Sequence, residues 1–145
     1  MKVSTRGEYA LRALILLGQH SSVISIAEIA EKTLVPDNYL EQILLQLKNL
    51  GYVRSKRGIR GGYTLRKSPD QIVIGEVIRQ LEGPLAPMGC VSITAYDPCP
   101  LEEGCLLKPL WTLIRDTVAQ LLEHTTLADL LEGRVPSMEE RVENK

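Results

Sequence analysis

All three cysteines of this 145-residue chain, Cys90, Cys99 and Cys105, lie in one short segment that is interrupted by prolines and glycines. Their spacing is Cys-x8-Cys-x5-Cys. Thiolates bind metals and undergo reversible oxidation, and in a reducing compartment clustered thiols serve these purposes more often than structural disulfides. The segment therefore predicts a metal, iron–sulfur or redox site, whose setting depends on the elements around it.

The composition allows one small domain with an appendage. Hydrophobic residues make up 44% of the chain, with no Phe and one Trp, so the core must consist mainly of Leu, Ile, Val and Ala. No apolar run reaches the length of a membrane span. The N-terminal stretch has helical spacing and does not resemble an export signal. We therefore expect a cytoplasmic protein with no membrane partner.

The net charge of −1 conceals an asymmetry. Residues 1–75 carry 11 Lys and Arg against 6 Asp and Glu, whereas residues 76–145 carry 6 against 12. A basic first half favours a polyanionic partner, although pairing between surface charges is an alternative explanation.

The first half has the pattern of a helix-turn-helix. Capping boxes at Thr5-x-x-Glu8 and Ser25-x-x-Glu28 predict the starts of two helices, over about 5–18 and 25–32. A third helix is expected over 36–50, with Pro36 in its first turn and leucines at helical spacing. A short helix, a tight turn and a second helix make the helix-turn-helix pattern.

Residues 52–57 and 63–67 then read as two short strands around a glycine-rich turn, which predicts a β-hairpin. No acidic residue lies between Tyr52 and Lys67. The hairpin, or wing, carries six cations: Arg54, Lys56, Arg57, Arg60, Arg66 and Lys67.

The second half predicts a helix over 74–81, the cysteine loop, and a long helix over 109–124. Thr126-x-x-Asp129 caps a last short helix. Heptad spacing indicates that the long helix pairs with a second subunit or with the domain core. Its apolar seam is Leu107, Trp111, Ile114, Val118 and Leu121.

The predicted fold is therefore mostly α with a small β-hairpin wing: a winged helix-turn-helix joined to a long dimerisation helix. Residues 1–83 form the DNA-binding domain, 84–108 the cysteine-bearing effector loop, and 109–133 the dimerisation helix with the short C-terminal helix. Residues 134–145 have little apolar content and are predicted to be disordered.

This arrangement predicts binding to double-stranded DNA. The second helix of a helix-turn-helix presents its N-terminal side chains to base edges in the major groove. Tyr39 could instead pack on the first helix. Wing cations suit phosphates or the minor groove, where Arg is favoured. The candidate DNA-binding residues are Asn38, Tyr39, Glu41 and Gln42 on the helix, and Arg54, Lys56, Arg57 and Arg60 on the wing.

No Cys-x-x-Cys, nucleotide-binding loop or paired general acid and base indicates an enzyme. A small redox or metal-carrier protein is the rival class, and only the thiols favour it.

Three segments resemble the Rrf2 family of bacterial winged-helix transcription regulators, and the resemblance extends to about Leu131. They are STRGEYALRAL (4–14), YLEQILLQLKNLGYVRSKRGIRGGYTL (39–65) and IGEVIRQLEGPL (74–85). The resemblance implies a homodimer, paired through the long helix, that binds roughly palindromic operators. It also implies that Tyr39, Glu41 and Gln42 face bases and that Arg57 reaches a minor groove.

Many members of the family hold an iron–sulfur cluster with three cysteines in this loop, whereas those similar to CymR lack the cysteines and respond to a partner protein. This chain is similar to the cysteine-bearing branch, with two departures. The first gap is x8 rather than x5, and Lys108 stands where IscR-like members have a histidine ligand.

A cluster usually needs four ligands. In NsrR-like members an acidic residue at the position of Glu8 completes the site from the other subunit, which makes Glu8 the candidate fourth ligand. The alternative is that Glu8 only caps its helix and pairs with Arg12. His20 and His124 are weaker candidates.

The sequence thus predicts an operator-binding transcription regulator, a repressor in its expected role, that senses iron–sulfur, redox or nitrosative status through the three cysteines. The type of cluster is left open. A cluster-free regulator of the same fold, controlled by thiol oxidation or a partner protein, is the alternative. Inert thiols and a zinc site are further options.

Overall fold

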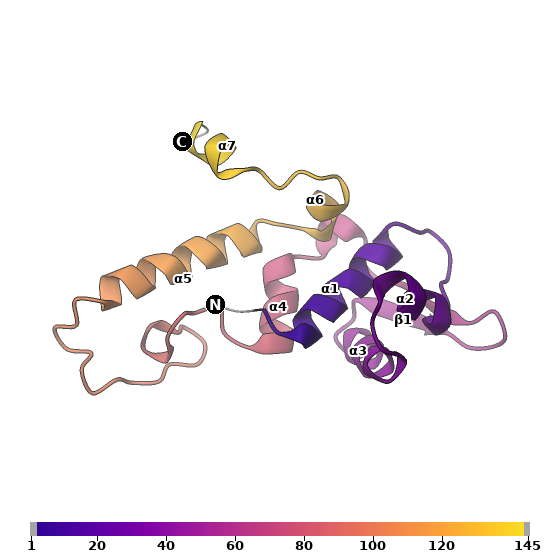
Figure 1. The fold of residues 1–145 in the computed structure, drawn as a ribbon, viewed down its shortest axis with the longest axis horizontal. Coiled ribbons are helices and arrows are strands. Elements are labelled where there is room, and N and C mark those ends of the chain that lie inside the picture. The colour runs from indigo at the N-terminus through magenta and orange to yellow at the C-terminus, as the bar shows by residue number, and fades with distance from the viewer. Residues whose placement is uncertain (1–2, 144–145) are drawn as a thin grey trace.

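The computed structural model describes residues 3–143 and is mostly helical, with one two-stranded antiparallel sheet (Figure 1). This confirms the predicted fold class. The helices and strands are, in order, α1 (Thr5–Gly18), α2 (Ile26–Thr33), α3 (Asp37–Asn49), β1 (Val53–Lys56), β2 (Gly62–Leu65), η1 (Pro69–Gln71), α4 (Ile74–Glu82), η2 (Gly89–Val91), α5 (Lys108–Glu123), α6 (Leu127–Leu131) and α7 (Met138–Glu143).

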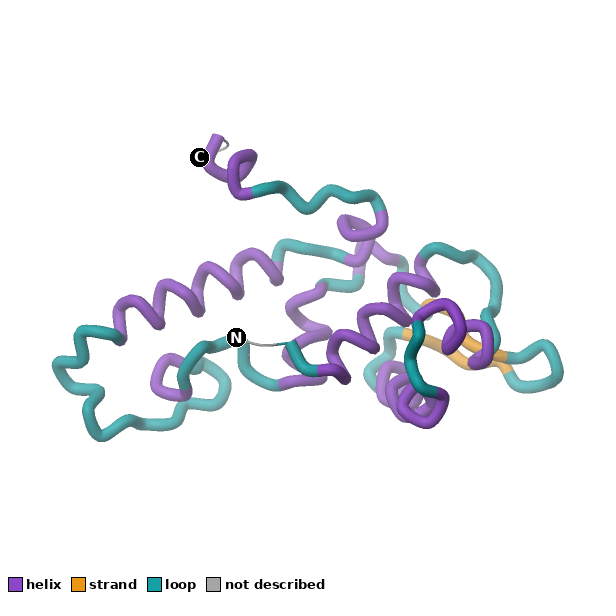
Figure 2. Tube along the Cα trace, in the orientation of Figure 1, coloured by secondary structure: helices purple, strands orange, loops and turns teal. Residues whose placement is uncertain are grey.

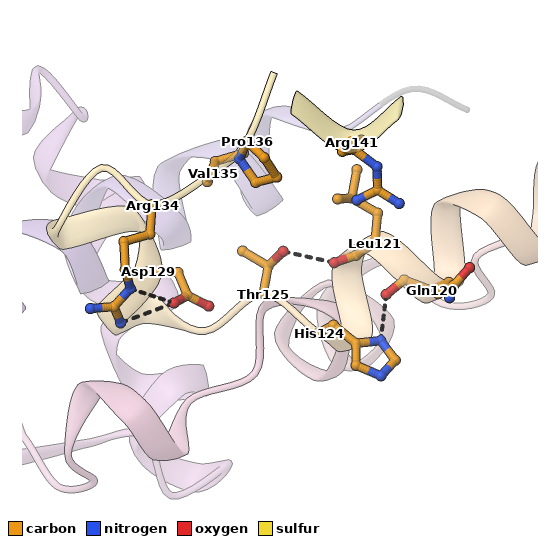
Figure 3. A pocket seen from close by; sticks show the side chains of 9 residues that line it. All are labelled: Gln120, Leu121, His124, Thr125, Asp129, Arg134, Val135, Pro136 and Arg141. Carbon is orange, nitrogen blue, oxygen red and sulfur yellow. Dashed lines mark hydrogen bonds and ion pairs between the residues drawn. The ribbon is translucent and has the colours of Figure 1, made fainter. Parts of the chain in front are cut away.

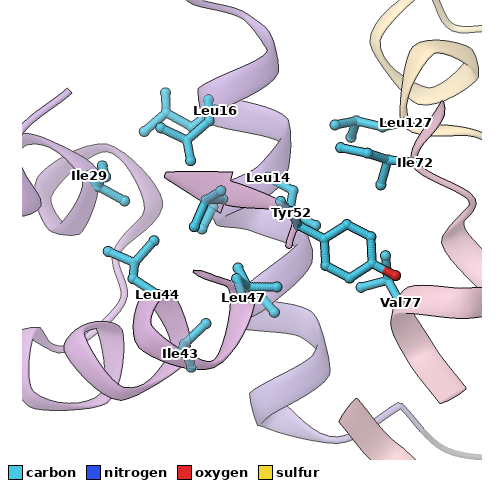
Figure 4. Close-up of a cluster of buried hydrophobic side chains, with 14 of the residues drawn as sticks. Leu14, Leu16, Ile29, Ile43, Leu44, Leu47, Tyr52, Ile72, Val77 and Leu127 are labelled. Atoms are coloured by element: carbon cyan, nitrogen blue, oxygen red, sulfur yellow. The ribbon is translucent and has the colours of Figure 1, made fainter. Parts of the chain in front are cut away.

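The core lies between α1, α2, α3, α4 and β1 (Figure 4). One face of α3 is fully buried because its apolar residues recur every three or four positions: Leu40, Ile43, Leu44 and Leu47. Each such side chain contributes about 2 kcal/mol by leaving water. Tyr52 is the largest fully buried side chain, and its hydroxyl donates to Gln80 Oε1 at 2.6 Å. The helix-turn-helix is therefore held by a continuous core.

The wing is fixed to the helix-turn-helix by backbone hydrogen bonds. Strand β1 pairs with β2 in the register Val53↔Leu65 to Lys56↔Gly62. Beyond the pair, Ile24 N donates to Tyr63 O at 3.0 Å and Tyr63 N donates to Ile24 O at 2.8 Å. Ile24 directly precedes Ser25, the N-cap of α2, so the wing and the start of α2 hold one another in place.

Helix α1 begins differently from its prediction. The N-cap is Ser4, whose hydroxyl accepts from Gly7 N at 3.1 Å, and Glu8 takes no part in a capping box. Glu82, at the end of α4, accepts from both Ser4 N and Ser4 Oγ at 2.6 and 2.7 Å. A Cβ on Gly7 would lie 2.0 Å from Glu82 Oε1, so Gly7 makes room for this contact.

The other caps follow local sequence more closely. Ser25 caps α2 through its side chain, and Thr126 with Asp129 forms the predicted capping box of α6. Pro36 lies one residue before α3, as its N-cap. Helix α7 lies within the range predicted to be disordered; Ser137 and Glu140 cap it by reciprocal hydrogen bonds. Residues 144–145 of that range lie outside the described residues.

Helix α5 lies on the side of the molecule away from the wing (Figure 1). A long connection, which contains the cysteines and only the short helix η2, joins it to α4 (Figure 2). Arg115 of α5 donates to Val91 O at 2.8 Å and so ties the loop to the helix. Within residues 3–143, none of the helices has the length and apolar character needed to cross a membrane.

Candidate nucleic-acid interface and cysteine loop

The outer face of α3 is polar at its N-terminal end. The buried leucine face fixes the helix in the core, and the four residues predicted to face bases are exposed on the opposite side: Asn38, Tyr39, Glu41 and Gln42. Amide and carboxylate side chains of this kind read base edges in the major groove. The structure therefore brings the predicted helix residues together on one accessible surface.

Tyr39 has two roles in this geometry. Its ring meets Tyr9 of α1 edge-on, with 6.4 Å between ring centroids and an interplanar angle of 77°. The side chain is still 54% exposed. Tyr39 therefore packs on the first helix, as the alternative interpretation predicted, while much of its ring stays exposed.

The wing cations point to solvent. All six are exposed, and within the described part of the chain none of them forms an ion pair with a carboxylate. Lys67 Nζ lies 4.9 Å from the centroid of the Tyr52 ring. Burial, and then the Glu76 carboxylate, raise the pKa of Tyr52, so its hydroxyl stays protonated beneath this cation. The result is an unneutralised cationic hairpin beside the polar face of α3.

The cysteines occupy separate places along the loop. Cys90 in η2 and Cys105 are partly buried, Cys99 is exposed, and all three are free thiols. Among the residues that the structure describes, no three His, Cys, Asp or Glu side chains lie close enough together to share a metal ion. The donor set suits iron–sulfur chemistry because three free thiols share one loop. Within one chain, however, the three thiols are not gathered at a single point.

Lys108 has a defined role that sequence reasoning missed. Its ammonium pairs with Glu102 Oε1, and Tyr96 donates its hydroxyl proton to Glu102 Oε2. The hydrogen bond from Lys108 lowers the pKa of Glu102, and the same contact raises the pKa of Lys108. This network borders a surface cavity of about 550 Å³ that Cys105 also lines. The side chain of Lys108 is thus held by an ion pair at the edge of the cavity.

Glu8 lies on α1 and forms an ion pair with Arg12 at 2.7 Å, with its side chain 56% exposed. Arg12 also donates to Thr33 O at 3.2 Å, at the end of α2, and its guanidinium lies 5.5 Å from the centroid of the Tyr9 ring. In one chain, Glu8 therefore makes the predicted i,i+4 pair, and among the described residues it belongs to no group of three metal-ligating side chains.

Helix α5 buries none of its residues fully. The predicted seam residues are partly buried or exposed, and two further leucines that the seam did not include, Leu110 and Leu113, are also exposed. The apolar side of α5 is therefore incompletely covered by its own chain.

A smaller cavity of about 240 Å³ lies where α5, α6 and the C-terminal segment meet (Figure 3). Two of its lining side chains already have partners: Arg134 pairs with Asp129 at 3.0 Å, and His124 Nδ1 lies 2.7 Å from Gln120 O. Hydrogen bonds, first from the Thr126 backbone, lower the pKa of Asp129. We assign this cavity a structural role.

The helix-turn-helix buries one face of α3 in the core and exposes the polar side. A hairpin whose cations form no ion pairs among the described residues lies beside it. These features define a winged-helix DNA-binding protein. A family model described as Rrf2, an iron-dependent transcriptional regulator, matches residues 3–133. The chain therefore belongs to the Rrf2 family of helix-turn-helix transcription regulators, which are not enzymes.

The similarity covers nearly the whole chain. CymR of Bacillus subtilis is 39% identical over 132 residues, which is 90% of this chain and 89% of CymR. NsrR of Geobacillus kaustophilus is 35% identical over 92% of both chains. The solved structure of CymR, titled as the global cysteine regulator of B. subtilis, superposes with a TM-score of 0.77 over 92% of this chain and 98% of CymR, at 38% identity. IscR of T. potens gives 0.72, at 33% identity over 92% and 88% of the two chains.

Proposed function

We propose that this protein is a cytoplasmic repressor that binds operator DNA as a homodimer and changes its DNA affinity through the cysteine loop. One observation carries the DNA-reading part of the proposal. The exposed polar end of α3 lies on the same rigid unit as six unpaired wing cations, because α2 and α3 share one core and the Ile24–Tyr63 hydrogen bonds join the wing to the start of α2. We assign base contacts to Asn38, Tyr39, Glu41 and Gln42, and backbone or minor-groove contacts to Arg54, Lys56, Arg57 and Arg60.

The uncovered side of α5 supports a homodimer. Apolar side chains at heptad spacing that stay accessible in one chain favour helix pairing with a second copy. The proposed contacts are Leu107, Trp111, Ile114, Val118 and Leu121, with Leu110 and Leu113 beside them. A dimer would also double the DNA-binding surface, as a palindromic operator requires.

We propose the cysteine loop as the effector site, with an iron–sulfur cluster as the group that it takes. Cys90, Cys99 and Cys105 would hold the cluster, and Glu8 of the other subunit is the candidate fourth ligand. The cluster would supply sensitivity to oxygen, nitric oxide or iron supply. What this chain does for that site is to present three free thiols on a loop that is tied to α5 through Arg115.

A cluster-free regulator is the second candidate, and the ion pair of Lys108 with Glu102 favours it. The ion pair occupies the position at which we considered a fourth cluster ligand. The three thiols are also not gathered together in one chain. Under this reading, oxidation of two thiols or contact with a partner protein at the loop supplies the signal.

A mobility-shift experiment on fragments of the organism's own genome tests the DNA part. We expect a few fragments to be retained preferentially, with an affinity that falls steeply as salt rises. Uniform, salt-insensitive binding would refute the proposal.

Anaerobic purification followed by iron and sulfide analysis and a visible spectrum separates the two candidates for the loop. A brown protein with stoichiometric iron and sulfide supports the cluster. A colourless, iron-free protein that resists reconstitution contradicts it and leaves the cluster-free candidate. Glu8→Ala then tests the fourth ligand: we expect faster cluster loss with an unchanged circular dichroism spectrum, and equal cluster stability would leave Glu8 as a partner of Arg12 only.

A further inference from the structure

The tip of the wing carries an apolar side chain that the fold does not use. Ile59 is 107% exposed, the highest value among the exposed large hydrophobic residues that the structure describes. It packs on nothing in its own chain. A β-branched residue is also a poor choice for a tight turn, where Gly, Asn, Asp, Pro and Ser are favoured. The stability of the hairpin therefore does not explain an isoleucine at this position.

The turn is built so that this side chain must project outward. Gly61 N donates to Gly58 O at 2.9 Å and closes the turn, and Gly58 has a φ of +110°. A Cβ on Gly61 would lie 2.3 Å from Lys56 O, so the interior of the turn has no room for side chains. Ile59 is consequently held at the outermost point of a narrow, closed tip.

The charges around the tip identify the kind of partner. Arg57 and Arg60 flank Ile59, both exposed, and no acidic residue lies on the hairpin. A cationic rim around one apolar point complements DNA, in which two phosphate backbones border the stacked base pairs of a narrow groove. An acidic protein surface would satisfy the arginines and would leave the isoleucine without a matching apolar site.

Resting on the DNA-binding function proposed above, we propose that Ile59 is an apolar wedge that enters the minor groove and partly opens a base step. Side chains such as Ile, Leu and Phe do this in other minor-groove proteins and bend the duplex. Opening costs least at pyrimidine–purine steps, which are flexible. Ile59 therefore selects for such a step in the part of the operator beneath the wing, while Arg57 and Arg60 hold the flanking phosphates.

The test uses full-length protein in metal-free reducing buffer and a duplex of about 30 base pairs, recovered by the wild type from a randomised pool. Ile59→Ala is expected to weaken binding about tenfold and to reduce the bend measured by end-to-end energy transfer. Ile59→Leu should retain both. Ile93→Ala is the matched control, because Ile93 is 79% exposed but lies in the cysteine loop.

Two further measurements distinguish an apolar wedge from a general loss of order in the wing. The salt dependence of Ile59→Ala should equal that of the wild type, since no charge is removed. 2-Aminopurine placed at the step beneath the wing should brighten when the wild type binds, and not when Ile59→Ala binds. Replacing that step by a stiff A-tract step should then weaken the wild type more than the variant.

Equal affinity, bend and fluorescence for Ile59→Ala and the wild type would overturn the wedge alone. Failure of the wild type to recover any preferred duplex, both in metal-free buffer and after anaerobic reconstitution with iron and sulfide, would overturn the proposed function and the wedge with it.

Discussion

The DNA-reading half and the half that contains the cysteine loop and α5 differ in how far one chain completes them. The first half has a continuous core, a hairpin hydrogen-bonded to the helix-turn-helix, and a net positive charge. In the second, α5 buries no residue fully and the three thiols remain apart. The first half is therefore structurally complete within one chain, whereas the second half leaves the incomplete parts that the proposed dimer and effector would complete. Four predictions test this difference.

Gly62→Ala should be the most damaging change. A Cβ at this position would lie 2.1 Å from Ile24 O, on the backbone that joins the wing to α2. We expect a loss of about 3 kcal/mol in the free energy of unfolding, measured in urea. Gly104→Ala is the control in the cysteine loop, where φ is +73° and nothing lies within 4 Å; it should cost about 1 kcal/mol. Equal losses would contradict the difference between the two halves.

Leu113→Glu should separate the subunits. Leu113 is 63% exposed on α5, and a charge there would have to be buried in a helix pair. We expect the dissociation constant of the dimer to rise about 100-fold, measured by sedimentation, with a nearly unchanged circular dichroism spectrum. Leu45→Glu, on the exposed side of α3, should leave the dimer intact. If the wild type is monomeric at every concentration, α5 does not pair two subunits.

Arg57→Gln should weaken DNA binding about tenfold, and the slope of log affinity against log salt should fall by about one. The reason is the loss of one exposed cation from the wing. Arg134→Gln serves as the control in the other half, because Arg134 is already paired with Asp129. If both variants bind DNA like the wild type, the wing does not contact the phosphates.

The smallest effect concerns the ion pair in the loop. Lys108 lowers the pKa of Glu102, so the stabilisation is present above the pKa of an unfolded glutamate and is lost as pH falls through the lower folded value. The protection factor of the loop amides, which corrects for the intrinsic pH dependence of hydrogen exchange, should therefore be steady from neutral pH to about pH 5 and should fall below about pH 4. Glu102→Gln should abolish this pH dependence, and Glu103→Gln should preserve it. A loop whose exchange has the same pH dependence in all three proteins would show that the pair does not order it.

Local patterns were enough to predict most of the elements. Leucine spacing placed α3, alternation placed the hairpin, and Thr126 with Asp129 placed α6. These signals depend on residues within a few positions of one another, and such residues stay together in any fold.

Contacts between distant residues were missed. Glu82 accepts hydrogen bonds from Ser4, the N-cap of α1, which lies 78 residues away, and no local sequence pattern predicts this contact. The bridge between Ile24 and Tyr63 was equally hidden, although the close approach is why residue 62 is glycine. In the candidate site, the sequence supplied the cysteines and the wing cations. The sequence did not predict that Lys108 pairs with Glu102, because two charged residues six positions apart in a loop have no fixed distance in space.

In the proposed function, one half of the protein reads DNA and the other half pairs two copies. A fluorescence anisotropy titration of the full-length protein on its selected duplex, at several salt concentrations, tests both parts at once. We expect saturation at two chains per duplex and an affinity that falls steeply and linearly on a log–log plot against salt. Binding without sequence preference or salt dependence, or saturation at one chain per duplex, would contradict it.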